Sequence, residues 1–173
     1  DAFTVVRYDP SGVSRSALAN LVDVAVETHA DDARRLLGAV TRESAVEFGH
    51  SGGGVISLAL VEQAPRLVGT LIAHEPPLIE LLPDAETRRA ETERVIETFH
   101  ADGFHAAWRA FMTTAGFELP AGAGEAPPPS ESEQRHAARF FDHDLRATTG
   151  YRPDVAALRA TAGRIVVGIG ADS

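Results

Sequence analysis

The chain has 173 residues, of which 44% are hydrophobic, so it is long and apolar enough to bury the core of one globular domain. Its formal net charge of −9 disfavours nucleic acid and anionic membrane surfaces as partners, because both attract basic faces. The sequence has neither lysine nor cysteine, which excludes a Schiff-base lysine, a phosphate-loop lysine, a thiol nucleophile, a disulfide and a thiolate metal site. We find no signal peptide and no apolar run long enough to cross a membrane, and we expect a soluble, cytoplasmic protein.

The first 75 residues alternate between predicted strands and predicted helices. Thr28 and Asp31 have the spacing of a capping box, and the apolar positions that follow predict a helix to about Val40. The residues after Gly54 are apolar nearly all round, which predicts a buried helix that ends before Pro65. Strands are predicted at 3–8, 44–48 and 68–74. This order is typical of a parallel sheet with covering helices.

The pattern after residue 76 changes to helices alone. Asp84 is a predicted N-cap for a helix to about Ala101, and Gly103 is its predicted stop. The stretch at 116–132 is rich in Ala, Gly and Pro and is predicted to be a flexible connection. Further helices are predicted at 104–112, 133–147 and 154–160, before a final buried strand at 164–169.

The strongest chemical signal is the motif Gly49-x-Ser51-x-Gly53, which follows a predicted strand and precedes a predicted helix. This pattern is typical of a nucleophile elbow, a sharp turn that holds one hydroxyl clear of the backbone. A side chain at either flanking glycine is expected to collide with the neighbouring strand or helix. Ser51 is therefore the predicted nucleophile, and the backbone N–H of Gly52 is the predicted oxyanion donor. The alternative is a serine that only caps the helix.

With this motif, the chain resembles the α/β-hydrolase family. The resemblance also rests on the segment 8–16, on a helical cap, and on a strand that ends in Gly170-Ala171-Asp172. It implies an α/β fold, a partial α/β-hydrolase with a mostly parallel sheet. Its core is expected at 1–75 and 163–173, with the cap inserted at 76–162.

The resemblance also implies a triad in the order Ser, acid, His. Asp172 matches the acid that follows the last strand, and Glu75 is a rival acid because some related hydrolases place it there. No histidine follows Asp172, and no oxyanion loop precedes the first strand. The family's third strand would lie between the strands at 3–8 and 44–48, which would otherwise lack a shared neighbour. We therefore expect an internal fragment or an incomplete gene product.

The leading hypothesis is a serine hydrolase that cleaves a small-molecule ester or related acyl substrate, with a histidine outside this chain as its base. His50, Trp108, Phe111 and His143 are candidates to line the substrate site, although helix packing explains the aromatic residues equally well. We expect no cofactor and no metal, because the cluster at 142–144 lacks a second ligand set at fixed spacing. The alternative hypothesis is a non-catalytic small-molecule-binding protein on a hydrolase fold. A haloalkane dehalogenase is disfavoured because its nucleophile is an aspartate.

Overall fold

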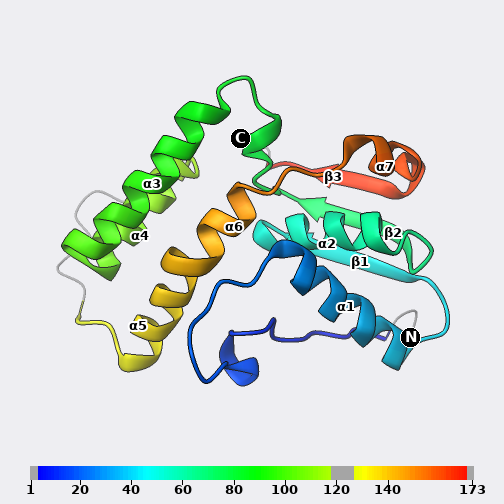
Figure 1. Ribbon diagram of the computed structural model, residues 1–173, viewed down its shortest axis with the longest axis horizontal. Coiled ribbons are helices and arrows are strands. Elements are labelled where there is room, and N and C mark those ends of the chain that lie inside the picture. Colours follow the sequence, from blue (N-terminus) through cyan, green and yellow to red (C-terminus); the bar gives the residue numbers. More distant parts are fainter. Residues whose placement is uncertain (1–3, 118–126, 171–173) are drawn as a thin grey trace.

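The structure is a computed structural model that describes residues 4–117 and 127–170 (Figure 1). Its sheet contains three strands within the described residues: β1 (Ala45–His50), β2 (Val68–His74) and β3 (Ile165–Gly168). The strand order is β1-β2-β3, and both pairings are parallel. The parallel sheet of the predicted α/β class is therefore confirmed, and the strand predicted at 68–74 has the predicted bounds.

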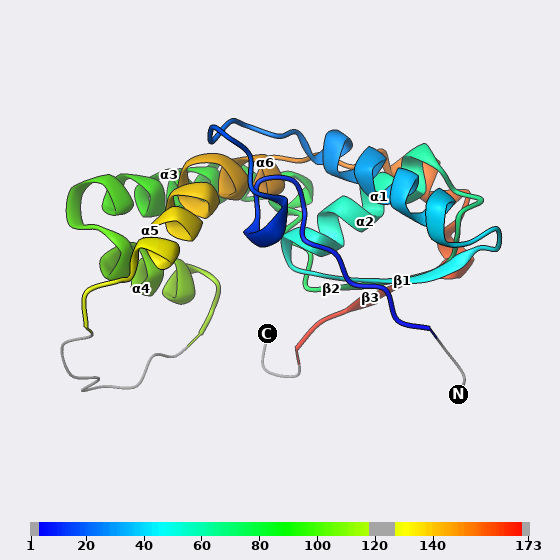
Figure 2. The same ribbon diagram turned by 90° about the horizontal axis from the view of Figure 1, so that it is seen from below.

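The helices form two groups, one packed on the sheet and one beyond the carboxyl ends of its strands. Helices α1 and α2 lie on the same face of the sheet, whereas α3 to α6 gather to one side (Figures 1 and 2). The helices are α1 (Val26–Val40), α2 (Gly52–Gln63), α3 (Ala85–Asp102), α4 (Phe104–Thr114), α5 (Glu131–Ala138), α6 (Leu145–Thr149) and α7 (Val155–Arg159). Single turns are found at η1 (Ser14–Ser16), η2 (Ile79–Leu81) and η4 (Ala162–Arg164), and η3 (Arg139–Asp144) is a π-helix.

The main core lies between the sheet and helices α1 and α2. Leu71 and Ala73 of β2 are fully buried and pack with Val55 and Leu60 of α2. α2 is buried along most of its length, as its uniformly apolar sequence predicts. The core therefore holds α2, and with it the residue before α2, in a fixed position on the sheet.

The opposite face of the sheet is open within the described residues (Figure 2). Phe48, Ile72 and Val166 are register partners across β1, β2 and β3, so their side chains share this face. Phe48 is 62% exposed, Val46 is 58% exposed and Val166 is 54% exposed. We call the set Val46, Phe48, Ile72 and Val166 the open sheet face.

A second core is built by helices α3 to α6. Phe141 is fully buried at its centre, among Val95 and Ile96 of α3, Ala107 of α4 and Leu145 of α6. The single helix predicted at 133–147 is instead α5, the π-helix η3 and α6 in succession. The π-helix begins at Arg139, a buried arginine that pairs with Asp144 at the end of the same turn.

Two sequence predictions for the N-terminal part are wrong. Residues 4–8 of the strand predicted at 3–8 form no strand, because no neighbouring strand pairs with their backbone in the described part of the chain. The predicted capping box at Thr28 is also wrong, because α1 begins at Val26 with Ala25 as its N-cap. Thr28 thus lies inside the first turn. No helix of residues 4–117 and 127–170 is long and apolar enough to span a membrane.

Candidate active site

Ser51 occupies the turn between β1 and α2 with a backbone conformation that is rare for a non-glycine residue. Its φ is 51° and its ψ is −126°. Such a conformation costs about 1–3 kcal/mol and persists only where its surroundings hold it. The Ser51 N–H donates to the His74 carbonyl oxygen at 2.9 Å, and the Ser51 carbonyl accepts from the Gly54 N–H at 2.8 Å. These two bonds fix the turn to the end of β2 and to the first turn of α2.

The two glycines of the motif have different surroundings. A Cβ added at Gly49 would lie 2.5 Å from the Gly53 carbonyl oxygen and 2.6 Å from the Ser57 Oγ, which is too close for any side chain. A Cβ added at Gly53 would meet no atom within 4 Å. The predicted collision is therefore confirmed at Gly49 and wrong at Gly53, because the outer side of α2 is open at that position.

The elbow is also packed from the side by α6. A Cβ added at Gly52 would lie 3.1 Å from the Thr148 Cγ2. The Thr148 Oγ1 donates to the Asp144 carbonyl at 2.8 Å, and the buried Arg139 guanidinium donates to the Asp144 carboxylate and to the Val22 carbonyl. The π-helix and the N-terminal segment thus position Thr148 against the predicted oxyanion donor.

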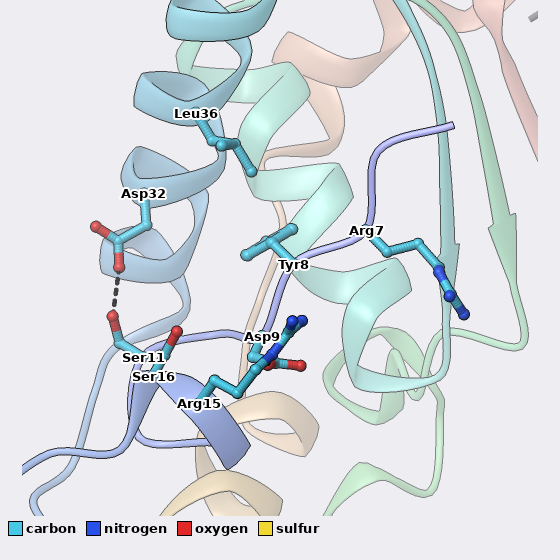
Figure 3. Close-up of a pocket in the computed structure, with 8 residues that line it drawn as sticks. All are labelled: Arg7, Tyr8, Asp9, Ser11, Arg15, Ser16, Asp32 and Leu36. Carbon is cyan, nitrogen blue, oxygen red and sulfur yellow. Dashed lines mark hydrogen bonds and ion pairs between the residues drawn. The ribbon is translucent and has the colours of Figure 1, made fainter. Parts of the chain in front are cut away.

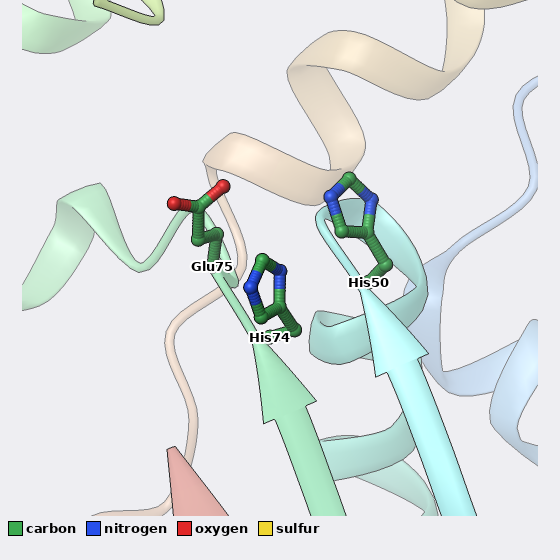
Figure 4. A group of neighbouring side chains, drawn as sticks. All are labelled: His50, His74 and Glu75. Atoms are coloured by element: carbon green, nitrogen blue, oxygen red, sulfur yellow. The ribbon is translucent and has the colours of Figure 1, made fainter. Parts of the chain in front are cut away.

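Three further side chains surround the elbow at the carboxyl ends of β1 and β2 (Figure 4). His50 and His74 are register partners on these adjacent strands, and their rings stack with centroids 5.2 Å apart and planes inclined by 17°. Glu75 follows His74 with a φ of 48°. The sequence identified His50 and Glu75 but missed His74. The sequence could have indicated His74, because it ends a predicted strand, and the ends of neighbouring parallel strands meet at one edge of a sheet.

Of the two candidate acids, only Glu75 lies among the residues that the structure describes. Glu75 lies at the end of β2, where its N–H donates to the Gly168 carbonyl and its Oε1 accepts from the Gly170 N–H, both at 2.8 Å. Asp172 lies outside the described residues. Glu75 therefore contacts the backbone that leads from β3 towards Asp172.

The remaining predicted site residues belong to other parts of the molecule. Trp108 and Phe111 contact each other and Phe140, in an aromatic group built by α4 and η3. Trp108 lines a hollow of about 200 Å³ beside this group. The His143 Nδ1 lies 2.7 Å from an Asp23 carboxylate oxygen. The elbow, in contrast, is built by β1, α2 and β2.

Another hollow, of about 540 Å³, lies between the N-terminal segment and α1 (Figure 3). Four of its polar side chains form two pairs: Ser11 donates to Asp32 at 2.8 Å, and Arg15 donates to Asp9 at 2.6 Å. Burial raises the pKa of the Tyr8 hydroxyl in its wall, and the charges of Glu47 and Asp32 raise it further. Nothing in this arrangement resembles a nucleophile with an adjacent base.

Glu47 is a partly buried carboxyl beneath the elbow, on β1. Burial raises its pKa, and the hydrogen bond that the Ser57 Oγ donates at 3.2 Å acts in the opposite direction. The Ser57 Oγ also lies next to Gly49, so this hydrogen bond helps to fill the space under the turn. We assign Glu47 a structural role.

The comparisons with known proteins agree with the fold. A family model described as the alpha/beta hydrolase fold matches residues 1–111. The chain belongs to this α/β-hydrolase family.

Two known proteins illustrate the similarity. The "Uncharacterized hydrolase YraK" of Bacillus subtilis (strain 168) is 49% identical over 90 residues. This match covers 51% of the present chain and 33% of the relative, so the matched region spans about a third of that protein's length. Among solved structures, the crystal structure of E-2-(Acetamidomethylene)succinate Hydrolase is 22% identical, with a TM-score of 0.36. That match covers 88% of this chain and 68% of the other.

Proposed function

We propose that this chain carries the nucleophile of a serine hydrolase that cleaves an ester or a related acyl substrate. The observation that supports the proposal most directly is the strained backbone of Ser51, held between β1 and α2 by the His74 carbonyl. A serine in such a turn presents its hydroxyl at the carboxyl edge of the sheet. A serine that only capped the helix would need no left-handed conformation, since N-cap residues are ordinarily in the β region.

In the proposed mechanism, the Ser51 Oγ attacks the substrate carbonyl carbon while a histidine base takes its proton. The Gly52 N–H, at the start of α2, donates to the oxyanion of the tetrahedral intermediate. Collapse of the intermediate expels the alcohol, which receives the proton back from the histidine, and leaves an acyl-serine that water then hydrolyses to the acid. Family order places this histidine after the acid in the chain.

A fluorophosphonate probe on the full-length protein tests the nucleophile. We expect covalent labelling at Ser51, complete loss of labelling in Ser51→Ala, and unchanged labelling in Ser44→Ala, which removes an exposed serine just before β1. The proposal is wrong if folded full-length protein is not labelled, or if Ser51→Ala is labelled like the wild type.

Substitutions in the same full-length protein show which of the two candidate acids, Glu75 or Asp172, orients the histidine. Replacing the acid that orients the histidine is expected to lower kcat by about 10⁴-fold, because the imidazole then loses its correct tautomer. We expect this loss in either Glu75→Gln or Asp172→Asn, and only a minor change in the other variant. Equal and small effects of both substitutions would contradict a Ser-acid-His triad built on either residue.

A second candidate function is the non-catalytic binding of an apolar small molecule. It is supported by the aromatic group around the hollow of about 200 Å³, in which Trp108 is still partly exposed. In that case, the Ser51→Ala variant would bind an apolar ligand with the same affinity as the wild type. The Trp108→Ala variant would bind it with lower affinity. Ser51-dependent labelling by the fluorophosphonate probe favours the hydrolase instead.

A further inference from the structure

Three side chains with metal-ligating atoms converge at the carboxyl edge of the sheet (Figure 4). Each of His50, His74 and Glu75 offers one ligand atom, and these atoms all lie within 4.8 Å of one another. We propose that these residues bind a divalent transition-metal ion such as Zn²⁺. The proposal goes beyond the hydrolase function, because it assigns these three side chains to a metal ion; for Glu75 this role is an alternative to that of the triad acid.

The topology explains why the three side chains meet. His50 and His74 are register partners at the last positions of β1 and β2, so both rings project on the same side of the sheet. Successive residues of an extended strand point to opposite faces, which would direct Glu75 away from His74. The φ of 48° at Glu75 interrupts the extended conformation and allows its carboxylate to approach the two rings.

The donor set fits the proposed class of metal. Two imidazoles and one carboxylate are a ligand set of catalytic zinc sites, with the fourth position left to water. Imidazole nitrogens favour Zn²⁺, Cu²⁺ and Ni²⁺, whereas Mg²⁺ and Ca²⁺ prefer oxygen ligands alone. A site with two histidines therefore selects a transition metal.

The surroundings leave the required atoms available. The His74 Nδ1 is buried and has no hydrogen-bond partner among the described residues, which costs free energy; an ion bound at this nitrogen would remove that cost. His50 is exposed, and the hydrogen bond from Gly170 uses the Oε1 of Glu75. A Cβ added at Gly168 would lie 3.1 Å from the His74 Cδ2, so this glycine leaves room for the ring beside β3.

Binding requires a small rearrangement of the side chains. Ligand atoms that each lie about 2.1 Å from a tetrahedral Zn²⁺ are about 3.4 Å from one another. In the structure, the three ligand atoms are separated by up to 4.8 Å. The two rings are nearly parallel, so they must turn until their nitrogens point to one centre. The exposed ring of His50 and the carboxylate of Glu75 are the groups that can move without disturbing the core.

Isothermal titration with Zn²⁺ of the chelator-treated full-length protein tests this site, with Co²⁺ absorption as a second readout of tetrahedral coordination. We expect one ion per chain at this site and a loss of affinity of at least about 10-fold in each of His50→Gln, His74→Gln and Glu75→Gln. The matched control is His100→Gln, an exposed histidine on α3, which should bind Zn²⁺ like the wild type.

Two results would overturn the proposal: no Zn²⁺ binding by the wild type, or the same affinity in His50→Gln as in the wild type. His50 is exposed, so its substitution tests the site without threatening the fold. Ser51→Ala separates this inference from the proposed hydrolase, because it should abolish probe labelling and leave Zn²⁺ affinity unchanged. A protein that binds Zn²⁺ but fails to label supports the metal site and refutes the hydrolase.

Discussion

Gly49 and Gly53 occupy equivalent places in the motif but have different physical roles. Gly49 is buried at the end of β1, and the backbone of Gly53 crosses directly over it. Gly53 itself faces open space on the outer side of α2. The motif therefore requires glycine at position 49, where a side chain has no room. At position 53 there is room for a side chain.

We expect Gly49→Ala to lower the free energy of unfolding by about 1–3 kcal/mol, because the added methyl overlaps the Gly53 carbonyl and the Ser57 hydroxyl. Gly53→Ala is the matched control and should raise it by up to about 1 kcal/mol, since alanine favours a helix over glycine. Urea unfolding of both variants measures the difference. Equal destabilisation by the two substitutions would show that the contacts at Gly49 do not set the turn.

At the scale of an element, two segments share the spacing of a capping box, and only one of them forms it. Ser130 and Glu133 make both reciprocal bonds at the start of α5, where the Ser130 N–H donates to the Glu133 carboxylate at 2.8 Å. Thr28 and Asp31 lie inside α1 instead. The start of α1 is set by burial, because Val26 packs in the main core one turn ahead of Ala30.

We predict that Ser130→Ala lowers the free energy of unfolding by about 1 kcal/mol, because the first turn of α5 loses its cap. Thr28→Ala removes an exposed side chain within α1 and should change it by less than about 0.5 kcal/mol. Chemical denaturation of both variants under the same conditions provides the measurement. A larger cost for Thr28→Ala than for Ser130→Ala would mean that the true cap of α1 involves Thr28.

The difference between local patterns and contacts between distant segments explains how much of the structure the sequence could predict. Local patterns were sufficient for β2, for α2 and for the elbow at Ser51, because each depends on neighbours within a few residues. The sequence could not exclude a strand at residues 4–8, since pairing depends on a strand elsewhere in the chain. It also missed His74, which gains its significance only when β1 and β2 lie side by side. The π-helix at Arg139 depends on a buried ion pair that no periodicity reveals.

At the scale of the whole molecule, the open sheet face is the largest departure from a parallel sheet, which is ordinarily covered on both faces. Contiguous apolar surface of this kind promotes association. We expect the 173-residue chain to self-associate at high concentration, and Phe48→Glu to reduce this association as measured by sedimentation velocity.

The matched control for Phe48→Glu is Phe117→Glu. Phe117 is 52% exposed but lies after α4, away from the sheet in the chain. The Phe117→Glu variant should have the same sedimentation profile as the wild type, because the substitution adds the same charge outside the open sheet face. If both variants reduce association equally, net charge and not the sheet face controls it.

The strand order also has a consequence for how the molecule folds. About 17 residues separate β1 from β2, whereas about 90 residues separate β2 from β3. Closing the longer loop costs roughly 1.5 kcal/mol more in chain entropy. The unit β1-α2-β2, which contains Ser51, His50 and His74 and is followed directly by Glu75, can therefore assemble before β3 docks. We therefore expect the turn that holds Ser51 to form as a local structure, and β3 to dock onto β2 afterwards.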